Sequence, residues 1–271
     1  MPRPRPPRTP AEFRRRYGPW ALVAGASEGL GAAFAAELAD RGLDLLLLAR
    51  RGDALEAVAA PLRARVQVRT AALDLADPDL AARLTDLTHD LDVGLLVYNA
   101  AYSTIGPFAA MSLADKERAL AVNCRGPLVA AHVLAPRMVA RGRGGIVLMS
   151  SLTALWGAPW LATYGASKAF DLALGEALWG ELAGAGVDVL SCCAGATRTP
   201  GFLRASAGPR PPRSMSADAV VREALHALGR RPSMIPGLGN RLAALALRLM
   251  PRRRAITILG DATARLRRSD P

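Results

Sequence analysis

The chain alternates short apolar runs with longer segments of helical periodicity, and this alternation constrains its fold more than any other feature of the sequence. Two of the runs, residues 45–48 and 146–149, are apolar at every position, as strands are when helices cover both faces of a parallel sheet. Strands that alternate with helices in this way predict βαβ units. We therefore expect an α/β fold with a doubly wound, parallel sheet of about seven strands.

The expected elements fill one domain of the 271-residue chain, because a single α/β domain commonly reaches this length. We place the domain at residues 17–236, between a flexible basic N-terminal extension at 1–16 and a basic amphipathic C-terminal extension at 237–271. The expected strands are 21–24, 43–48, 66–71, 93–98, 146–149, 187–192 and 233–235. The expected helices are 30–41, 54–64, 78–88, 113–140, 162–183 and 217–228, and the Gly- and Pro-rich residues 205–212 form an expected loop.

The net charge of +12 is concentrated at the two ends of the chain. Residues 1–16 hold six arginines and one acid, residues 204–271 hold fourteen arginines and four acids, and residues 17–203 carry a net charge of −3. A domain that binds nucleic acid more often has a basic folded body with aromatic residues among its charges, and only 5% of these residues are aromatic. The distribution argues against nucleic-acid binding.

Other features predict a cytoplasmic protein. Prolines interrupt the basic N-terminal segment, and the first apolar stretch leads into a glycine-rich turn rather than a cleavage site, so we expect no signal peptide. No apolar run of about 18 residues indicates a transmembrane helix. The three cysteines, Cys124, Cys192 and Cys193, form neither a disulfide framework nor a spaced metal-binding set. This pattern fits a reducing compartment.

A glycine-rich turn follows the first expected strand and opens the first expected helix. Glycines let backbone N–H groups approach a pyrophosphate, and the N-terminal end of the following helix attracts the same anion. The turn therefore predicts a dinucleotide site of the Rossmann type, although glycines at this spacing also serve close helix–strand packing. Its expected cofactor contacts are Gly25, Ser27, Glu28, Gly29, Leu30 and Gly31.

Two arginines, Arg50 and Arg51, stand after the second expected strand, where this fold contacts the adenosine ribose. A guanidinium there pairs with a 2′-phosphate, whereas an acid would bind a free 2′-hydroxyl. The pair therefore favours NADP(H) over NAD(H), although solvated surface arginines would look the same and Glu28 would repel a phosphate. Further expected cofactor contacts follow the third and fourth strands, at Asp74, Leu75, Asn99, Ala100 and Ala101.

The strongest chemical signal is the pair Tyr164 and Lys168 in an expected helix, with Ser151 at the end of the fifth expected strand. Side chains at i and i+4 lie on one face of a helix. A phenol ordinarily titrates near pH ~10, and a neighbouring ammonium stabilises its phenolate, so the pair suits acid–base chemistry near neutral pH. Lys168 is also one of only two lysines beside thirty-three arginines, which indicates a position that arginine cannot fill.

A series of motifs stands in order along the chain: Gly25-xxx-Gly29-x-Gly31, Asp74, Asn99-Ala100-Ala101, Asn123, Ser151, Tyr164-xxx-Lys168 and Ala194-Gly195-xxx-Thr199. In these motifs residues 17–236 resemble the short-chain dehydrogenase/reductase family. Three positions depart from the family pattern, since Ala24 replaces a threonine, Ala194 replaces a proline, and Tyr98-Asn99-Ala100-Ala101 replaces Asn-Asn-Ala-Gly. None of them removes a catalytic group.

The resemblance implies a sheet order of 3-2-1-4-5-6-7, no metal, and a homodimer or homotetramer. It also implies a catalytic tetrad in which Tyr164 is the acid and base, Ser151 binds the reacting oxygen, Lys168 holds the nicotinamide ribose and Asn123 supports a chain of water molecules. Tyr164 and Lys168 also belong to the expected cofactor site, which Gly195, Thr197 and Thr199 would complete.

These features predict an oxidoreductase that transfers a hydride between NADP(H) and a carbonyl or alcohol group. The expected pocket walls, residues 152–161 and then Phe202 and Leu203, are apolar and include Trp156 and Trp160. They favour an apolar substrate, although the tryptophans would also suit an oligomer interface. The alternative function is a catalytically idle cofactor-binding or membrane-surface scaffold of the same fold.

The C-terminal extension predicts an amphipathic helix with basic ends. Leu242, Leu245 and Leu249 form an apolar stripe, with Arg241 before it and arginines at 252–254 after it. Such a helix could pack on the domain or a second subunit, lie on an anionic membrane surface, or cover an apolar pocket. Packing is the ordinary arrangement, and membrane contact would make the protein membrane-peripheral.

Overall fold

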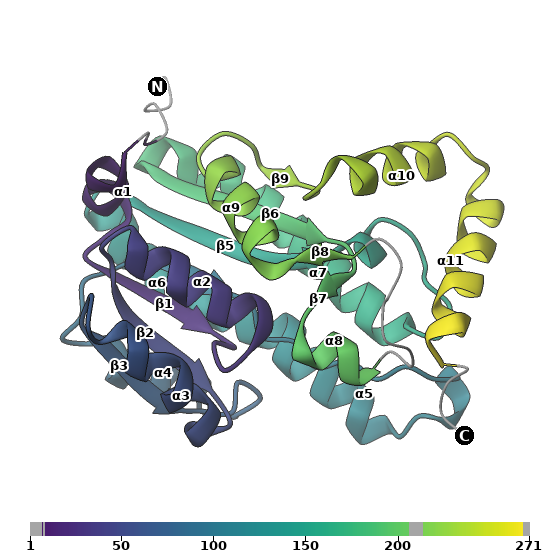
Figure 1. Cartoon of the computed structure of the whole chain (residues 1–271), viewed down its shortest axis with the longest axis horizontal. Coiled ribbons are helices and arrows are strands. Elements are labelled where there is room, and N and C mark those ends of the chain that lie inside the picture. Colours follow the sequence, from purple (N-terminus) through teal and green to yellow (C-terminus); the bar gives the residue numbers. More distant parts are fainter. Residues whose placement is uncertain (1–6, 8, 206–213, 268–271) are drawn as a thin grey trace.

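The computed structural model describes residues 7, 9–205 and 214–267. Seven parallel strands form one sheet in the order β3-β2-β1-β4-β5-β6-β9 (Figure 1). This confirms the predicted doubly wound α/β fold. Strand β9 takes the seventh place in the predicted order, because β7 and β8 form a separate two-stranded sheet. The strands are β1 Trp20–Ala24, β2 Asp44–Ala49, β3 Val68–Ala72, β4 Val93–Tyr98, β5 Gly144–Ser151, β6 Val187–Ala194 and β9 Ser233–Met234.

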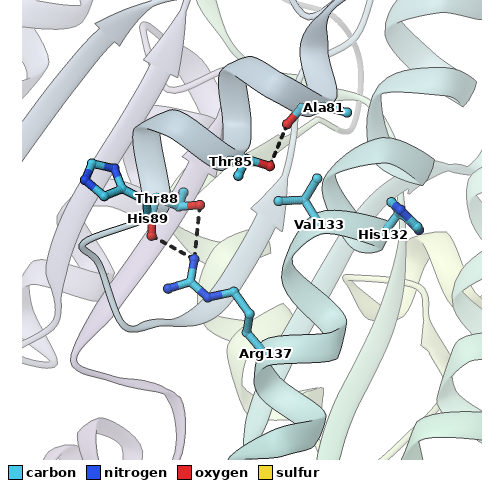
Figure 2. A pocket seen from close by; sticks show the side chains of 7 residues that line it. All are labelled: Ala81, Thr85, Thr88, His89, His132, Val133 and Arg137. Atoms are coloured by element: carbon cyan, nitrogen blue, oxygen red, sulfur yellow. Dashed lines mark hydrogen bonds between the residues drawn. The ribbon is translucent and has the colours of Figure 1, made fainter.

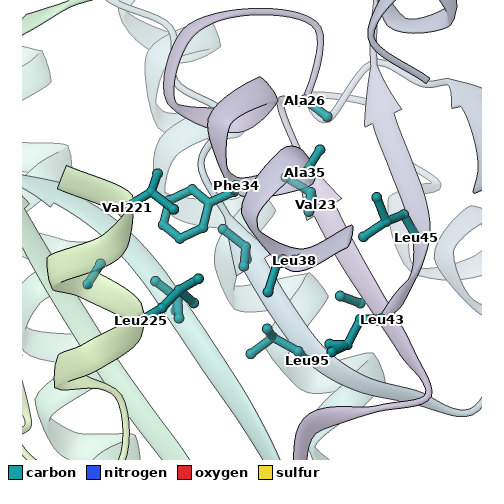
Figure 3. Packing of buried hydrophobic residues seen from close by; sticks show 14 of the residues in the cluster. Val23, Ala26, Phe34, Ala35, Leu38, Leu43, Leu45, Leu95, Val221 and Leu225 are labelled. Atoms are coloured by element: carbon teal, nitrogen blue, oxygen red, sulfur yellow. The ribbon is translucent and has the colours of Figure 1, made fainter. Parts of the chain in front are cut away.

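Helices cover both faces of the sheet, which is why its central strands are apolar at every position. On one face, Phe34 of α2 lies against Val221 and Leu225 of α9 (Figure 3). On the other face, Leu84 of α4 and Leu134 of α6 belong to a second buried cluster. The first face carries α2 Gly29–Asp40, α3 Gly52–Leu62 and α9 Ala217–Ala227, and the second carries α4 Leu80–Thr88, α6 Gly126–Ala140 and α7 Ala162–Leu182.

Helix α1 (Pro10–Tyr17) lies where a flexible extension was expected. Thr9 caps it, because the Thr9 hydroxyl accepts from the Glu12 N–H at 3.2 Å while the Glu12 carboxylate accepts from the Thr9 N–H at 3.3 Å. Phe13 and Tyr17 are buried in the first cluster. The expectation was therefore wrong for residues 10–16, since burial of two aromatic side chains holds this helix on the domain.

A buried acid anchors the end of α1. The Asp188 carboxylate of β6 accepts from the Tyr17 hydroxyl at 2.7 Å and from Arg16 Nε at 2.6 Å. Burial raises the pKa of Tyr17 well above its ordinary value, and the Asp188 charge adds to this rise. Tyr17 is therefore a permanent hydrogen-bond donor to the sixth strand.

The long helix predicted over residues 113–140 is interrupted by a π-helical turn. The Tyr98 hydroxyl donates to the Val122 carbonyl at 2.7 Å, and Gly126 leaves room for it, because a Cβ there would lie 1.9 Å from that hydroxyl. The wider turn buries Asn123 completely, as π-turns often do at functional positions. The three parts are α5 Leu113–Leu120, the π-turn Ala121–Arg125 and α6 Gly126–Ala140.

The C-terminal part begins with a small parallel pair of strands and ends in two helices. Pro251 lies between α10 and α11, which the sequence treats as one amphipathic segment. No described helix combines the length and apolarity needed to cross a membrane. The elements are β7 Thr197–Arg198, α8 Pro200–Ala205, β8 Met215–Ser216, α10 Leu238–Arg248 and α11 Arg252–Arg267. Apart from residue 205, the loop predicted at 205–212 lies outside the described residues.

The leucine stripe predicted in the C-terminal segment does not pack on the domain. Leu242, Leu245 and Leu249 are 57%, 54% and 79% exposed, whereas Ala244 and Ala255 are buried. The two helices arch beside the end of the sheet where the strands finish (Figure 1). They therefore pack through small residues and leave the stripe uncovered.

Candidate active site

The glycine turn is a close-packed cradle at the carboxyl end of β1. Gly25 has a φ of 81°, and a Cβ there would lie 2.7 Å from the Ala100 backbone. A Cβ on Gly31 would lie 1.9 Å from the Gly25 carbonyl oxygen. Glu28 precedes α2 without capping it through its side chain, so this helix end keeps N–H groups for an anion. The cradle fits a pyrophosphate.

The far side of this turn meets the segment after β6. A Cβ on Gly29 would lie 2.9 Å from the Thr199 side chain, so Thr199 is beside the cradle. Thr197 is buried, and its hydroxyl donates to the Gly195 carbonyl at 3.0 Å. The structure thus brings the two predicted halves of the cofactor site together.

Arg51 and Glu28 form an ion pair of 2.8 Å between the end of β2 and the glycine turn. The carboxylate that could repel a phosphate is therefore neutralised by one of the two arginines expected to bind it. Arg50 forms no ion pair within the described parts of the chain, and its charge helps to lower the pKa of Asp74.

Asp74 lies at the carboxyl end of the sheet but is already engaged. Its carboxylate accepts from the Ala76 N–H at 3.0 Å and from Arg118 at 2.7 Å. Burial acts to raise the pKa of this carboxyl, but these two donors outweigh burial and the net pKa is lowered. Leu75 is buried in the second cluster, so only its backbone could contact a cofactor. The Asn99 side chain donates to the Gly25 carbonyl at 2.9 Å and braces the cradle.

The Tyr164–Lys168 pair lies on one face of α7 beside the end of β5. Lys168 Nζ is 5.9 Å from the centre of the Tyr164 ring. The backbone of this turn is fixed from the strand, because the Ser150 hydroxyl donates to the Lys168 carbonyl at 2.7 Å. The Ser151 hydroxyl accepts from the Thr153 N–H at 3.2 Å. Tyr164 and Ser151 are both partly exposed, so a substrate can reach them.

Asn123 is held from two sides in the π-turn. Its side chain donates to Ser167 Oγ and to the Tyr102 carbonyl, both at 2.9 Å, and accepts from the Tyr102 N–H at 2.7 Å. Ser167 in turn donates to the Tyr164 carbonyl at 2.8 Å. Asn123 therefore connects the loop after β4 with the helix that carries Tyr164.

Sequence reasoning missed a buried acid in this site. Asp171 accepts from Lys168 Nζ at 2.9 Å, and Nζ also donates to the Met149 carbonyl at 2.8 Å. Burial raises the pKa of the Asp171 carboxyl, and the Lys168 ammonium opposes that rise. The i, i+3 spacing of an acid after a lysine is visible in the sequence, but the same spacing is common on solvated helix faces.

A cavity of about 530 Å³ adjoins the segment that follows Ser151. Leu155 and Trp156 form one wall, as predicted, while α10 supplies the other. Phe202 and Leu203, the expected second wall, are absent from its described lining. The remaining lining residues are Ile235, Arg241, Ala244, Leu245, Arg248, Met250 and Arg252.

Helix α11 lies beside the loop that connects Ser151 with Tyr164. A Cβ on Gly260 would lie 3.0 Å from Pro159, so this helix packs against the loop between Ser151 and Tyr164. Trp160 in that loop has a φ of 70°, and no other non-glycine residue in the described ranges has a positive φ. Its carbonyl accepts from the Gly106 N–H at 3.0 Å, which joins this loop to the one after β4.

A second cavity, of about 510 Å³, lies between α4 and α6 (Figure 2). Arg137 donates there to the Thr88 carbonyl at 2.7 Å, at the end of α4 that leads into β4. This places the cavity toward the amino end of the strands, away from the tetrad. Arg137 serves as a cap for α4.

Comparison with known proteins agrees with this geometry. The family model for short chain dehydrogenases matches residues 19–208. The 7β-hydroxysteroid dehydrogenase of Clostridium sardiniense is 34% identical over 235 residues, which cover 84% of this chain and 89% of that protein.

Two solved structures match most of the chain. One, from a study of 7β-hydroxysteroid dehydrogenase stereoselectivity, has a TM-score of 0.86 at 30% identity and covers 91% of this chain and 98% of its own. The other, a short-chain dehydrogenase from Sphingobium yanoikuyae in complex with NADPH, has a TM-score of 0.75 at 33% identity, covering 89% and 96%. The chain therefore belongs to the short-chain dehydrogenase/reductase family and is an oxidoreductase that acts on CH–OH or C=O groups.

Proposed function

We propose that this protein transfers a hydride between NADP(H) and a ketone or secondary alcohol on a large apolar skeleton, with Tyr164 as the acid and base. The observation that carries the proposal is the convergence of the glycine cradle, the partly exposed Tyr164 and Ser151, and an apolar cavity at one end of the sheet. A catalytically idle scaffold would have no need of this arrangement.

The cradle fits the cofactor because side chains are excluded from it. Gly25, Gly29 and Gly31 have no space for a Cβ, so backbone N–H groups at the start of α2 would hold the pyrophosphate. Arg50 and Arg51 would hold a 2′-phosphate, and the Glu28 charge that opposes this is already paired. Asn99, Ala100 and Ala101 would line the adenosine side, with Thr197 and Thr199 opposite. When bound, the nicotinamide supplies or accepts the hydride.

The side chains of Tyr164 and Ser151 would bind the carbonyl or alcohol oxygen of the substrate. In reduction, the Tyr164 hydroxyl donates its proton to that oxygen as negative charge develops there, and the Ser151 hydroxyl donates a hydrogen bond to the same atom. Lys168 would stabilise the Tyr164 phenolate and hold the ribose of the cofactor. Asn123, which fixes the loop after β4, would support the chain of water molecules that returns a proton to Tyr164.

The substrate class follows from the cavity between Trp156 and α10. Its lining is apolar at Leu155, Trp156, Ile235 and Leu245, which suits a steroid-like or long acyl skeleton. The related 7β-hydroxysteroid dehydrogenase is named for such a substrate. Arg241, Arg248 and Arg252 also line the cavity and would favour a substrate that carries an anionic group away from the carbonyl.

Replacing Tyr164 with phenylalanine tests the assignment. The variant loses the transferable proton and little else, so we expect turnover to fall by about two orders of magnitude or more while the Kd for NADPH stays nearly unchanged. Turnover would be followed by NADPH absorbance with hydroxysteroids and apolar ketones, and Kd by NADPH fluorescence. Glu181→Gln, at an exposed position near the other end of the same helix, is the control. Near-normal turnover in Tyr164→Phe would refute the proposal.

A second proposal concerns assembly and location. We propose a homodimer or homotetramer, supported by the exposed apolar side chains Leu113 and Leu120 on α5 and Leu128 on α6. Three free cysteines support a reducing, cytoplasmic compartment. Light scattering of the purified protein tests assembly, and a monomer at micromolar concentration would contradict it.

Peripheral membrane contact is a separate proposal, favoured by the uncovered stripe of α10. Leu242 and Leu249 are exposed, and arginines 252–254 follow them. Such a surface should bind anionic liposomes at low salt and be released as ionic strength rises. Failure of the full chain to cosediment at low salt would remove the proposal, and truncation after Gly237 should abolish any binding.

A further inference from the structure

Asp171 is a buried acid that the reaction described above does not use. Its Oδ2 accepts from Lys168 Nζ at 2.9 Å, and the two residues are 1% and 2% exposed. Nζ also donates to the Met149 carbonyl at 2.8 Å, two residues before Ser151. The lysine head is therefore fixed between α7 and the end of β5.

The carboxylate does not tie other elements together. Its second oxygen, Oδ1, is buried and has no hydrogen-bond partner in the described residues. A buried ion pair adds little net stability, because desolvation of both charges offsets their attraction. A pair of this kind that includes a lysine beside the reacting tyrosine points to a role in the reaction rather than in the fold.

We propose that Asp171 is a positioning residue, which keeps Lys168 protonated and holds its Nζ beside Tyr164 so that the ammonium stabilises the Tyr164 phenolate. This inference rests on the proposed role of Tyr164 as acid and base. Burial by itself favours a neutral amine, and the carboxylate at 2.9 Å opposes that effect. An ammonium has three N–H donors, so bonds to Asp171 and Met149 leave one for a ribose hydroxyl.

Two further titratable groups face this pair from neighbouring elements. Burial is the first cause of the raised pKa values of Tyr98 in β4 and of Cys124 in the π-turn, and the Asp171 charge adds to both. Lys168 opposes the rise at Cys124. Since neither group can carry a positive charge, Lys168 is the cation that balances Asp171 at this position.

The distances decide the direction of the effect on Tyr164. Asp171 lies in hydrogen-bond contact with Nζ, whereas Nζ is 5.9 Å from the centre of the Tyr164 ring. The carboxylate therefore acts more strongly on the lysine than on the phenol. Removing its charge should deprive Tyr164 of the ammonium, so that the phenol ionises at higher pH.

The variant Asp171→Asn tests this, because the amide keeps the size of the side chain and can still accept from Nζ. We expect the pH at which Tyr164 ionises to rise by about one pH unit. Ultraviolet difference titration of tyrosinate, each protein against its own Tyr164→Phe version, measures this without a substrate. The rising limb of kcat/KM against pH for alcohol oxidation should move in the same direction.

The controls separate this role from a structural one. Glu181→Gln removes a charge from an exposed position of the same helix and should shift neither titration. Asp171→Glu keeps the charge, so Tyr164 should ionise at the same pH as in the unaltered protein. Thermal melting shows whether each variant is folded. If Asp171→Asn does not fold, Asp171→Leu replaces it as an apolar side chain of similar size.

An unchanged or lower ionisation pH for Tyr164 in the folded variant would overturn the proposal. Because the titration needs no substrate, it remains informative if every substrate fails. A Tyr164→Phe enzyme that still turns over, by contrast, would remove the proposed function itself.

Discussion

The two arginines after β2 differ in their ion pairing, and this difference predicts that their replacement will weaken cofactor binding to different extents. Arg51 is paired with Glu28 at 2.8 Å, whereas Arg50 has no ion pair in the described parts of the chain. If Arg50 binds a 2′-phosphate as proposed, replacing it with alanine should remove a charge-assisted contact worth about 2 kcal/mol. The Kd for NADPH should then rise about 30-fold.

Replacing Arg51 should cost less, because Arg51 must leave Glu28 before it can bind a phosphate. A solvent-accessible ion pair contributes about 0.5 kcal/mol, so the net loss is about 1.5 kcal/mol, or roughly 10-fold in Kd. By the same reasoning Glu28→Gln should tighten NADPH binding about twofold. The Kd for NADH should change less than about twofold in all three variants, since NADH has no 2′-phosphate.

Fluorescence titration with each nucleotide at low ionic strength measures these values. Arg83→Ala, which removes the same charge from an exposed position on α4, is the matched control. Equal losses for NADPH and NADH in Arg50→Ala would refute the reasoning and show that this arginine supports the fold. A larger loss for Arg51→Ala than for Arg50→Ala would refute the assigned cost of the Glu28 pair.

Two further outcomes follow from the site. Gly31→Ala would place a Cβ 1.9 Å from the Gly25 carbonyl oxygen, so we expect no NADPH binding and a lower melting temperature; unchanged fluorescence titration would contradict the cradle. Burial raises the pKa of Cys124 to about 11, with Asp171 adding to the rise, so the thiol stays protonated below that pH. Its alkylation, followed by mass spectrometry, should be slow at pH 7 and accelerate toward pH 11, and rapid alkylation at pH 7 would show that the thiolate forms there.

Much of the fold and the pairing of Tyr164 with Lys168 could be predicted from periodicity alone. A run such as 146–149, apolar throughout, leaves few choices besides a covered strand, and β5 contains it. The i, i+4 spacing likewise fixes two side chains on one helix face whatever surrounds them. These signals are local, and local geometry determines them.

What could not be predicted depends on contacts between distant segments. Asp171 is buried because its helix packs on β5 and β6, and the sequence shows the acid without the packing. The π-turn shifts the helical register by one residue at Asn123, which no apolar period reveals. Helix α1 is a different case, since Thr9 and Glu12 carry the spacing of a capping box, and that signal was available.

The anchoring of α1 also orders events during synthesis. The Tyr17 hydroxyl bonds to an acid 171 positions later in the chain. At a rate of about 5–20 residues per second, the first helix would wait on the order of ten to thirty seconds for its acceptor to leave the ribosome. A nascent chain stalled before Asp188 emerges should therefore leave α1 open to protease, while one stalled well beyond it should protect this helix; equal cleavage of the two would show that docking does not depend on β6. Helix α1 is thus synthesised well before the strand that anchors it.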